Sequence, residues 1–164
     1  MKTPPLPTTD LTVTPQFAAV EISAVTRIDA PIERAWTVLT DTEAWSRWNP
    51  LVRSLDGALA VGERLTVELH LEGRKPQTFR PMVTDVVPGT SFEWLGRLGV
   101  PGLFDGRHRF ELRRLDARSC ELVHSERLAG GLVPAFKKML TGATPRSFVA
   151  MNEAFAAEVL ARAD

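Results

Sequence analysis

The feature that most constrains the fold of this chain is a change in the period of its hydrophobic residues. Between residues 64 and 128 they recur at every second position, which is the period of a β-strand. From Leu132 to the C-terminus they recur at every third or fourth position, which is the period of a helix. Strands that are followed by a long amphipathic helix predict an α+β domain, with the helix packed on one face of an antiparallel sheet.

The same patterns predict the individual elements. Two short helices interrupt the strands early in the chain, one starting at Pro31 and one running from Thr42 to Trp48. A long helix is predicted over residues 145–162, with Thr144 as its N-cap and a break after Gly142 from the helical segment before it. Alternation predicts strands at residues 19–29, 64–71, 76–87, 91–95, 104–115 and 119–128.

Domain organisation and location follow from composition. Residues 1–16 contain several prolines and no apolar core segment, so we expect an extended, mobile leader before one domain at residues 17–164. No stretch resembles a signal peptide or is apolar for long enough to span a bilayer, which predicts no membrane insertion. The single cysteine excludes an internal disulfide and suits a reducing compartment, so the expected location is cytoplasmic.

The charge balance limits the classes of partner. The 20 lysines and arginines equal the 20 aspartates and glutamates, which argues against coating nucleic acid or sitting on an anionic membrane. Four arginines between residues 107 and 114 alternate with carboxylates, so they predict a solvated face with paired charges. We therefore expect no nucleic-acid partner.

Two segments carry a resemblance to a known family. Residues 28–41 with 45–50 (Trp45-Ser46-Arg47-Trp48-Asn49-Pro50), and residues 124–134, resemble the START-like, or SRPBCC, helix-grip superfamily in its polyketide cyclase/dehydratase-like branch. The resemblance implies a curved seven-stranded antiparallel sheet that grips the C-terminal helix around a ligand cavity, with the seventh strand at residues 51–55. Pro145 departs from an uninterrupted gripping helix, which implies either a kink or a separate lid-like segment over residues 133–141.

The resemblance does not select one function, because the superfamily includes lipid carriers, receptors, cyclases and chaperone activators. The leading prediction is a binder of a small, mostly hydrophobic molecule in the cavity. One alternative is a polyketide cyclase/dehydratase-like enzyme that uses the same cavity. Another is a protein-interaction module of the chaperone-activator type, which would need an exposed apolar patch outside the cavity.

Two histidines and a glutamate are the candidates for chemistry. Period two places His108 and Phe110 on one face, and His124 and Glu126 on the equivalent face of the next strand, so the hairpin sets His108 opposite either His124 or Glu126. Such a group can move protons, orient a ligand, or simply satisfy its own hydrogen bonds in the interior. The spacing is not that of a metal site, and we expect neither metal nor cofactor.

Apolar side chains complete the predicted binding site. The stripe on the C-terminal helix serves either as core or as the roof of the cavity, and Trp94 either as core or as wall. Cys120 is predicted to be a small buried hydrophobe, and His70 to be exposed unless its strand face lines the cavity. The full set of predicted ligand-binding residues is Trp48, Phe79, Trp94, Phe104, His108, Phe110, Leu122, His124, Glu126, Phe136, Leu140, Phe148, Met151 and Phe155.

Overall fold

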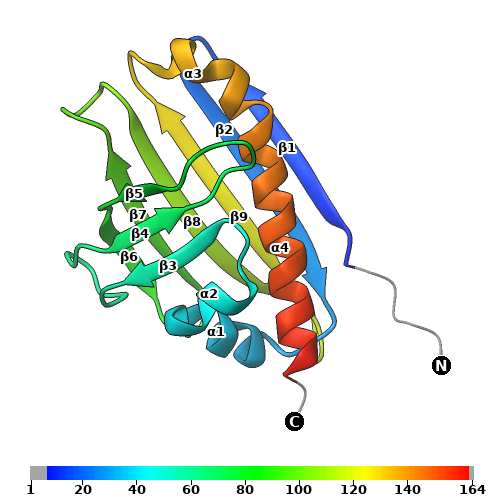
Figure 1. The fold of residues 1–164 in the computed structure, drawn as a ribbon. Helices are drawn as coiled ribbons and strands as arrows, with labels where there is room; N and C mark the ends of the chain where they lie inside the picture. Colours follow the sequence, from blue (N-terminus) through cyan, green and yellow to red (C-terminus); the bar gives the residue numbers. More distant parts are fainter. Residues whose placement is uncertain (1–6, 163–164) are drawn as a thin grey trace.

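The computed structural model describes residues 7–162 and places a long helix against the concave side of a curved antiparallel sheet (Figure 1). Six strands form the larger sheet in the order β1-β2-β9-β8-β7-β6, and three form a smaller one in the order β3-β4-β5. The larger sheet consists of β1 (Thr9–Pro15), β2 (Ala19–Ile28), β6 (Met82–Val87), β7 (Ser91–Arg97), β8 (Asp105–Arg114) and β9 (Cys120–Ala129). The α+β helix-grip prediction is confirmed, with nine strands in the described residues where seven were expected.

The prediction of one continuous strand at residues 76–87 is wrong. It is divided into β5 (Gln77–Phe79) and β6, and Arg80 and Pro81 lie between them. Proline has no N–H to donate to a strand ladder, so the pairing stops there. The Pro81 carbonyl instead accepts a hydrogen bond of 2.8 Å from the Leu65 amide, which joins the smaller sheet to the larger one.

The smaller sheet also contains β3 (Val52–Asp56) and β4 (Thr66–Leu69). The side chain of Asn49 organises the start of β3, because its Oδ1 accepts from the amides of Leu51 (2.9 Å) and Val52 (2.8 Å). This turn lets the chain leave the preceding helix and enter the sheet at once. The strand that the resemblance implied at residues 51–55 is therefore present.

The N-terminal segment differs from the expected leader. Thr9–Pro15 form β1, which pairs antiparallel with β2 from Thr9↔Thr26 to Pro15↔Val20, so the sheet begins before residue 17. The pairing was not predicted because prolines mark this segment as an extended leader and most of β1 is exposed, although Leu11 and Val13 alternate with polar residues. Residues 1–6 of the expected leader lie outside the described residues.

The helices follow the predicted order. Early in the chain come α1 (Ile32–Thr40), a 3₁₀ turn η1 (Thr42–Ala44) and α2 (Trp45–Trp48); after the strands come α3 (Val133–Leu140) and α4 (Ala143–Ala161). The break at Gly142 is confirmed, but Thr144 is not the N-cap, because Gly142 takes that position. The buried Thr144 hydroxyl has no hydrogen-bond partner among the described residues. Within the described residues, no helix has the length and hydrophobicity that crossing a bilayer requires.

Candidate functional site

A cavity lies between the sheets and the junction of α3 with α4. Its walls come from β4, β5, β7, β8, β9 and both C-terminal helices, so residues far apart in sequence meet there. Most of the lining is aliphatic or aromatic, and it includes Leu69, Phe79, Trp94, Leu128 and Phe148. The ionisable groups on the lining are His108, Glu126 and Arg97.

The cavity encloses about 120 Å³ of open space. One buried water needs roughly 10–15 Å³ by this kind of measure, so there is room for about ten non-hydrogen atoms. A larger depression of about 350 Å³ lies beside α1 and the β3–β4 connection, but none of its lining side chains can ionise. The mostly apolar lining with a few polar groups on one side is typical of a small-molecule site, so we take this cavity as the candidate site.

The Glu126 carboxylate reaches the cavity because residue 106 is glycine. Gly106 lies on β8 beside Glu126 on β9, and a Cβ built at Gly106 would lie 2.9 Å from Glu126 Oε1. Oε1 lies 3.7 Å from His108 Nδ1, and no closer hydrogen-bond partner of Glu126 is present among the described residues. The carboxylate is thus available as an acceptor for a donor on a bound molecule.

A buried hydrogen-bond chain runs from His108 toward α4. His108 Nε2 lies 2.6 Å from His124 Nε2, and His124 Nδ1 lies 3.0 Å from Asn152 Oδ1. The Asn152 amide is oriented by its two donor bonds, 3.0 Å to the Ala24 carbonyl and 3.1 Å to Thr26 Oγ1. Oδ1 must then accept, so His124 carries its proton on Nδ1 and its Nε2 accepts from His108 Nε2–H.

These hydrogen bonds determine which ring nitrogen of His108 faces the cavity. Since its Nε2 proton is held by His124, the ring meets Glu126 through Nδ1. Nδ1 accepts a proton when the ring is neutral and donates one when it is charged. The pair His108 and Glu126 can therefore accept, hold or return a proton at the cavity wall.

His124 itself does not reach the cavity. It is fully buried, with its ring stacked on Phe148 at 4.0 Å and on Phe110 at 4.5 Å between centroids. Burial, helped by the nearby His108, lowers the pKa of His124 well below its ordinary value of 6.5, although the Asn152 bond opposes the shift. His124 is therefore a neutral support for His108 at pH 7.

Comparison with known families agrees with this architecture. Residues 19–160 match the protein family described as polyketide cyclase/dehydrase and lipid transport. The chain belongs to this family. Among curated proteins, no sequence matches closely enough to count as a relative.

Several solved structures share the fold of this chain at low sequence identity. The Zhui aromatase/cyclase from Streptomyces sp. R1128 has a TM-score of 0.73 and 18% identity over 88% of this chain and 95% of its own. Norcoclaurine synthase from Thalictrum flavum, in complex with dopamine and hydroxybenzaldehyde, has a TM-score of 0.67 and 16% identity over 89% of each chain. A START superfamily protein from Mycobacterium smegmatis has a TM-score of 0.67 and 20% identity over 87% of this chain and 99% of its own.

The structure divides the predicted ligand-binding residues into two groups. Those on the cavity wall are Phe79, Trp94, Phe104, His108, Glu126, Leu140 and Phe148. The remaining seven do not line it. Trp48 packs on Trp45 and Phe155, and Phe136 packs on Phe104. Trp48 and Phe136 are partly exposed, whereas the other five are buried in the interior: Phe110, Leu122, His124, Met151 and Phe155.

Several site residues were missed by sequence reasoning. Asn152 is one turn from Phe148 on α4, and a polar residue inside an apolar helical stripe was the signal that could have found it. Gly106 and Leu128 continue the period-two faces of His108 and Glu126. Thr144 and Met139 come from the helix break, for which strand periodicity carries no information.

The other candidates take simpler positions. Cys120 is buried, as predicted, and burial raises the pKa of its thiol to about 11, so it stays protonated. His70 is partly exposed and pairs with Glu68 at 2.6 Å, outside the candidate cavity. In the part of the chain that the structure describes, no cluster of three or more His, Cys, Asp or Glu side chains is arranged to hold a metal ion.

The buried His124 predicts a pH-dependent stability. Below pH 6.5, His124 binds a proton in the unfolded chain but stays neutral in the folded chain, because its pKa is lowered there. The free energy of unfolding should therefore fall as pH falls. The contribution is about 1.4 kcal/mol per pH unit once the unfolded histidine is protonated. Urea unfolding at pH 7.5, 6 and 5 should show this loss in the wild type, and a shallower one in His124→Gln.

His70→Gln provides the matched control, because it removes a histidine from the surface rather than the interior. It should keep the steep pH dependence of the wild type. Equal slopes for His124→Gln and the wild type would contradict the neutral, buried state of His124.

Proposed function

We propose that this chain binds a small, mostly apolar molecule in the cavity, with a hydrogen-bond donor of that molecule directed at Glu126. The observation that carries the proposal is an apolar hollow of about 120 Å³ with a carboxylate and an imidazole on one side. Burial of the ligand's apolar surface supplies affinity, at about 25 cal/mol per Å², and the polar pair supplies orientation. The family description, which includes lipid transport, supports the same class of ligand.

The test uses two probes of similar shape, 1-naphthol, which carries a donor, and 1-methoxynaphthalene, which does not. The wild type should bind 1-naphthol more tightly, since a hydrogen bond to a charged acceptor contributes about 1.5–3 kcal/mol. Gly106→Ala should weaken 1-naphthol binding by about tenfold, because the new Cβ displaces the flexible end of Glu126. Tryptophan fluorescence titration can measure both affinities, since Trp94 lies on the wall.

Gly96→Ala is the control for lost volume. Gly96 pairs with Gly106 across β7 and β8 and lines the same cavity, but a Cβ there meets only ordinary contacts at 3.8 Å or more. It should leave the preference for 1-naphthol in place. A wild type that binds neither probe would count against the proposal, and an unchanged preference in Gly106→Ala would count against the role of Glu126.

A second candidate function is acid–base catalysis on such a molecule. It is favoured by one observation: His108 is held by His124 on one side and faces Glu126 and the cavity on the other. Candidate polyketide-like or aromatic carbonyl compounds can be incubated with the protein and followed by mass spectrometry. Turnover that is lost in His108→Gln with retained folding would favour the enzyme, whereas binding without turnover favours the binder.

A further inference from the structure

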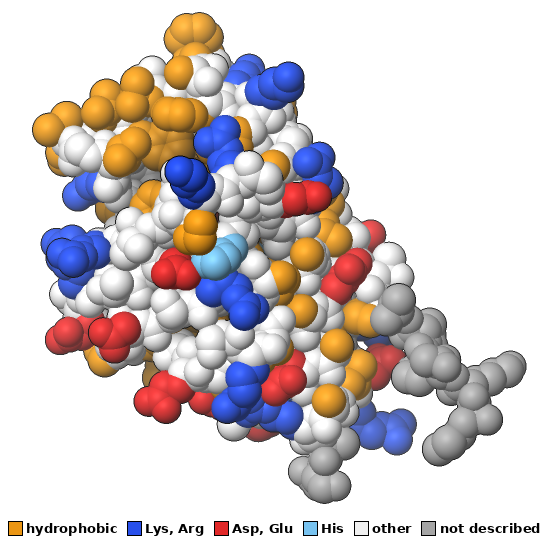
Figure 2. All heavy atoms as spheres, viewed as in Figure 1, with side chains coloured by type: hydrophobic (Ala, Val, Ile, Leu, Met, Phe, Trp, Pro, Cys, Tyr) orange, Lys and Arg blue, Asp and Glu red, His pale blue; other side chains and the backbone are white. Residues whose placement is uncertain are grey.

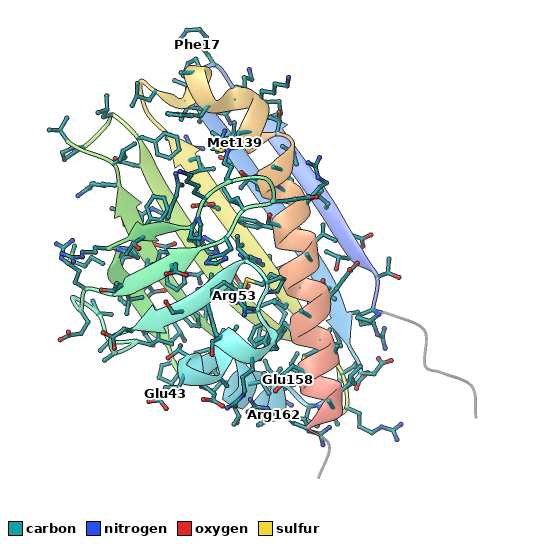
Figure 3. All side chains as sticks on the ribbon, viewed as in Figure 1. Phe17, Glu43, Arg53, Met139, Glu158 and Arg162 are labelled. Atoms are coloured by element: carbon teal, nitrogen blue, oxygen red, sulfur yellow. The ribbon has the colours of Figure 1, made fainter. Side chains whose placement is uncertain are left out.

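Three of the exposed hydrophobic side chains lie at one end of the molecule. Phe17, in the β1–β2 turn, is 88% exposed, while Val100 and Leu98, in the β7–β8 loop, are 66% and 48% exposed. We call these three residues the apolar tip. Figure 2 shows a concentration of hydrophobic side chains over this end of the molecule, and Figure 3 shows Phe17 projecting beyond the ribbon.

Backbone hydrogen bonds hold the two parts of the apolar tip together. The turn between β9 and α3 donates from Gly130 N to Ala18 O at 2.9 Å, and from Gly131 N to Gly102 O at 3.0 Å. The β1–β2 turn and the β7–β8 loop are thereby fixed to the same central turn. The residues of the apolar tip therefore form one surface that backbone hydrogen bonds hold in place, rather than a set of scattered residues.

Helix α3, which carries two lysines, lies at the same end of the molecule as the apolar tip (Figure 1). Lys137 and Lys138 are exposed on α3, and Lys137 Nζ donates to Gln16 O at 3.3 Å beside Phe17. Neither ammonium has a carboxylate partner within 4 Å among residues 7–162. Arg97 adds a third cation and is paired with Asp105 at 3.5 Å.

The lining of the cavity reaches the apolar tip. Leu98 belongs to both the apolar tip and the cavity lining, and Phe104 and Met139 line the cavity from the β7–β8 side and from α3. A molecule that leaves the cavity past these side chains comes out at the apolar tip. The surface and the cavity are therefore continuous.

We propose that the apolar tip docks on a membrane surface that contains anionic phospholipid, so that an apolar ligand passes between membrane and cavity without crossing water. The proposal goes beyond the proposed function, which requires no membrane. The equal numbers of positive and negative residues in the whole chain predict no such attraction, but the unpaired lysines are local to this end.

The chemistry of the tip fits a lipid surface better than a protein. Its apolar side chains project from two loops rather than from the face of a helix or strand. Apolar side chains flanked by lysines suit the interface of an anionic bilayer, where rings and aliphatic groups enter the headgroup layer and the ammonium groups meet phosphate. Docking of this kind needs both the apolar side chains and the lysines, so each of the two can be tested with its own variant.

The experiment is flotation of the purified full-length chain with two kinds of vesicle: phosphatidylcholine alone, and phosphatidylcholine with about a third phosphatidylserine. The wild type should float with the anionic vesicles and much less with the neutral ones, and added salt should weaken the binding. The double variant Phe17→Ser/Val100→Ser and the variant Lys138→Glu should each lose binding by about tenfold or more.

Matched controls come from elsewhere on the surface. The side chain of Val61 is 64% exposed, a fraction similar to the 66% of Val100. Arg118 is exposed in the β8–β9 turn, at the opposite end of the β8–β9 hairpin from the apolar tip. Val61→Ser and Arg118→Glu should float like the wild type. Absence of wild-type binding to anionic vesicles, or equal losses in these controls, would overturn the proposal.

Two further outcomes separate the alternatives. If size-exclusion chromatography shows a wild-type dimer that Phe17→Ser/Val100→Ser converts to a monomer, the tip is an interface between copies and the membrane proposal is overturned. Binding of 1-naphthol without vesicles should be unchanged in the tip variants. Loss of vesicle docking with intact 1-naphthol binding is the expected result, and failure of 1-naphthol binding in the wild type would count against the proposed function alone.

Discussion

Replacing Gly130 by alanine should lower the free energy of unfolding by about 3 kcal/mol, and the Tm by about 10 °C. Gly130 has φ of 136°, a conformation that residues with a side chain rarely adopt. A Cβ at this position would lie 2.5 Å from the Leu103 carbonyl oxygen and 2.8 Å from that of Gly102. Both are backbone atoms, so the clash cannot be relieved by rotating a side chain.

The neighbouring glycine provides the control. Gly131 has no positive φ, and a Cβ there would meet nothing within 4 Å, so Gly131→Ala should change stability by less than about 0.5 kcal/mol. Thermal unfolding followed by circular dichroism can compare the two variants with the wild type. Equal Tm values for Gly130→Ala and Gly131→Ala would contradict the close packing of this turn on the β7–β8 loop.

The fold was predictable because its main elements are local in sequence. Alternation alone located β2, β8 and β9, and the helical period located α4. The errors occur where a distant partner decides the outcome. β1 forms because β2 offers an unpaired edge, and the strand before Pro81 ends because the proline amide cannot join a ladder.

The site was predictable to the level of strand faces and no further. Period two placed His108 opposite either His124 or Glu126 on one hairpin, and the structure pairs it with Glu126. The contact of His108 with His124 runs diagonally at 2.6 Å, among the packed rings of Phe110 and Phe148, and strand periodicity does not encode such a contact. Asn152 contacts β2 from α4, 128 residues from Ala24 in sequence, and only the packed fold brings them together.

Replacing Asn152 by leucine should lower the free energy of unfolding by about 3 kcal/mol, although leucine is apolar and of similar size. The change removes the bonds to the Ala24 carbonyl and Thr26 Oγ1 and the acceptor for His124 Nδ1–H. All of these groups are away from water, so they lose partners that solvent cannot replace. Glu153→Leu, on the exposed side of the same helix, provides the control and should change stability little.

The same variant also tests the proton positions assigned to the histidine pair. In the wild type at neutral pH, ¹⁵N spectra of labelled histidine should show His124 with its proton on Nδ1, and Asn152→Leu should remove that preference. His108 then loses a fixed acceptor for its Nε2 proton, so the preference of the cavity for 1-naphthol over 1-methoxynaphthalene should weaken together with the change in the spectrum. If stability falls while the His124 resonances and the ligand preference stay as in the wild type, Asn152 supports packing but does not set the proton on His124. The two readouts therefore separate a residue that holds α4 on β2 from one that positions the imidazole at the cavity wall.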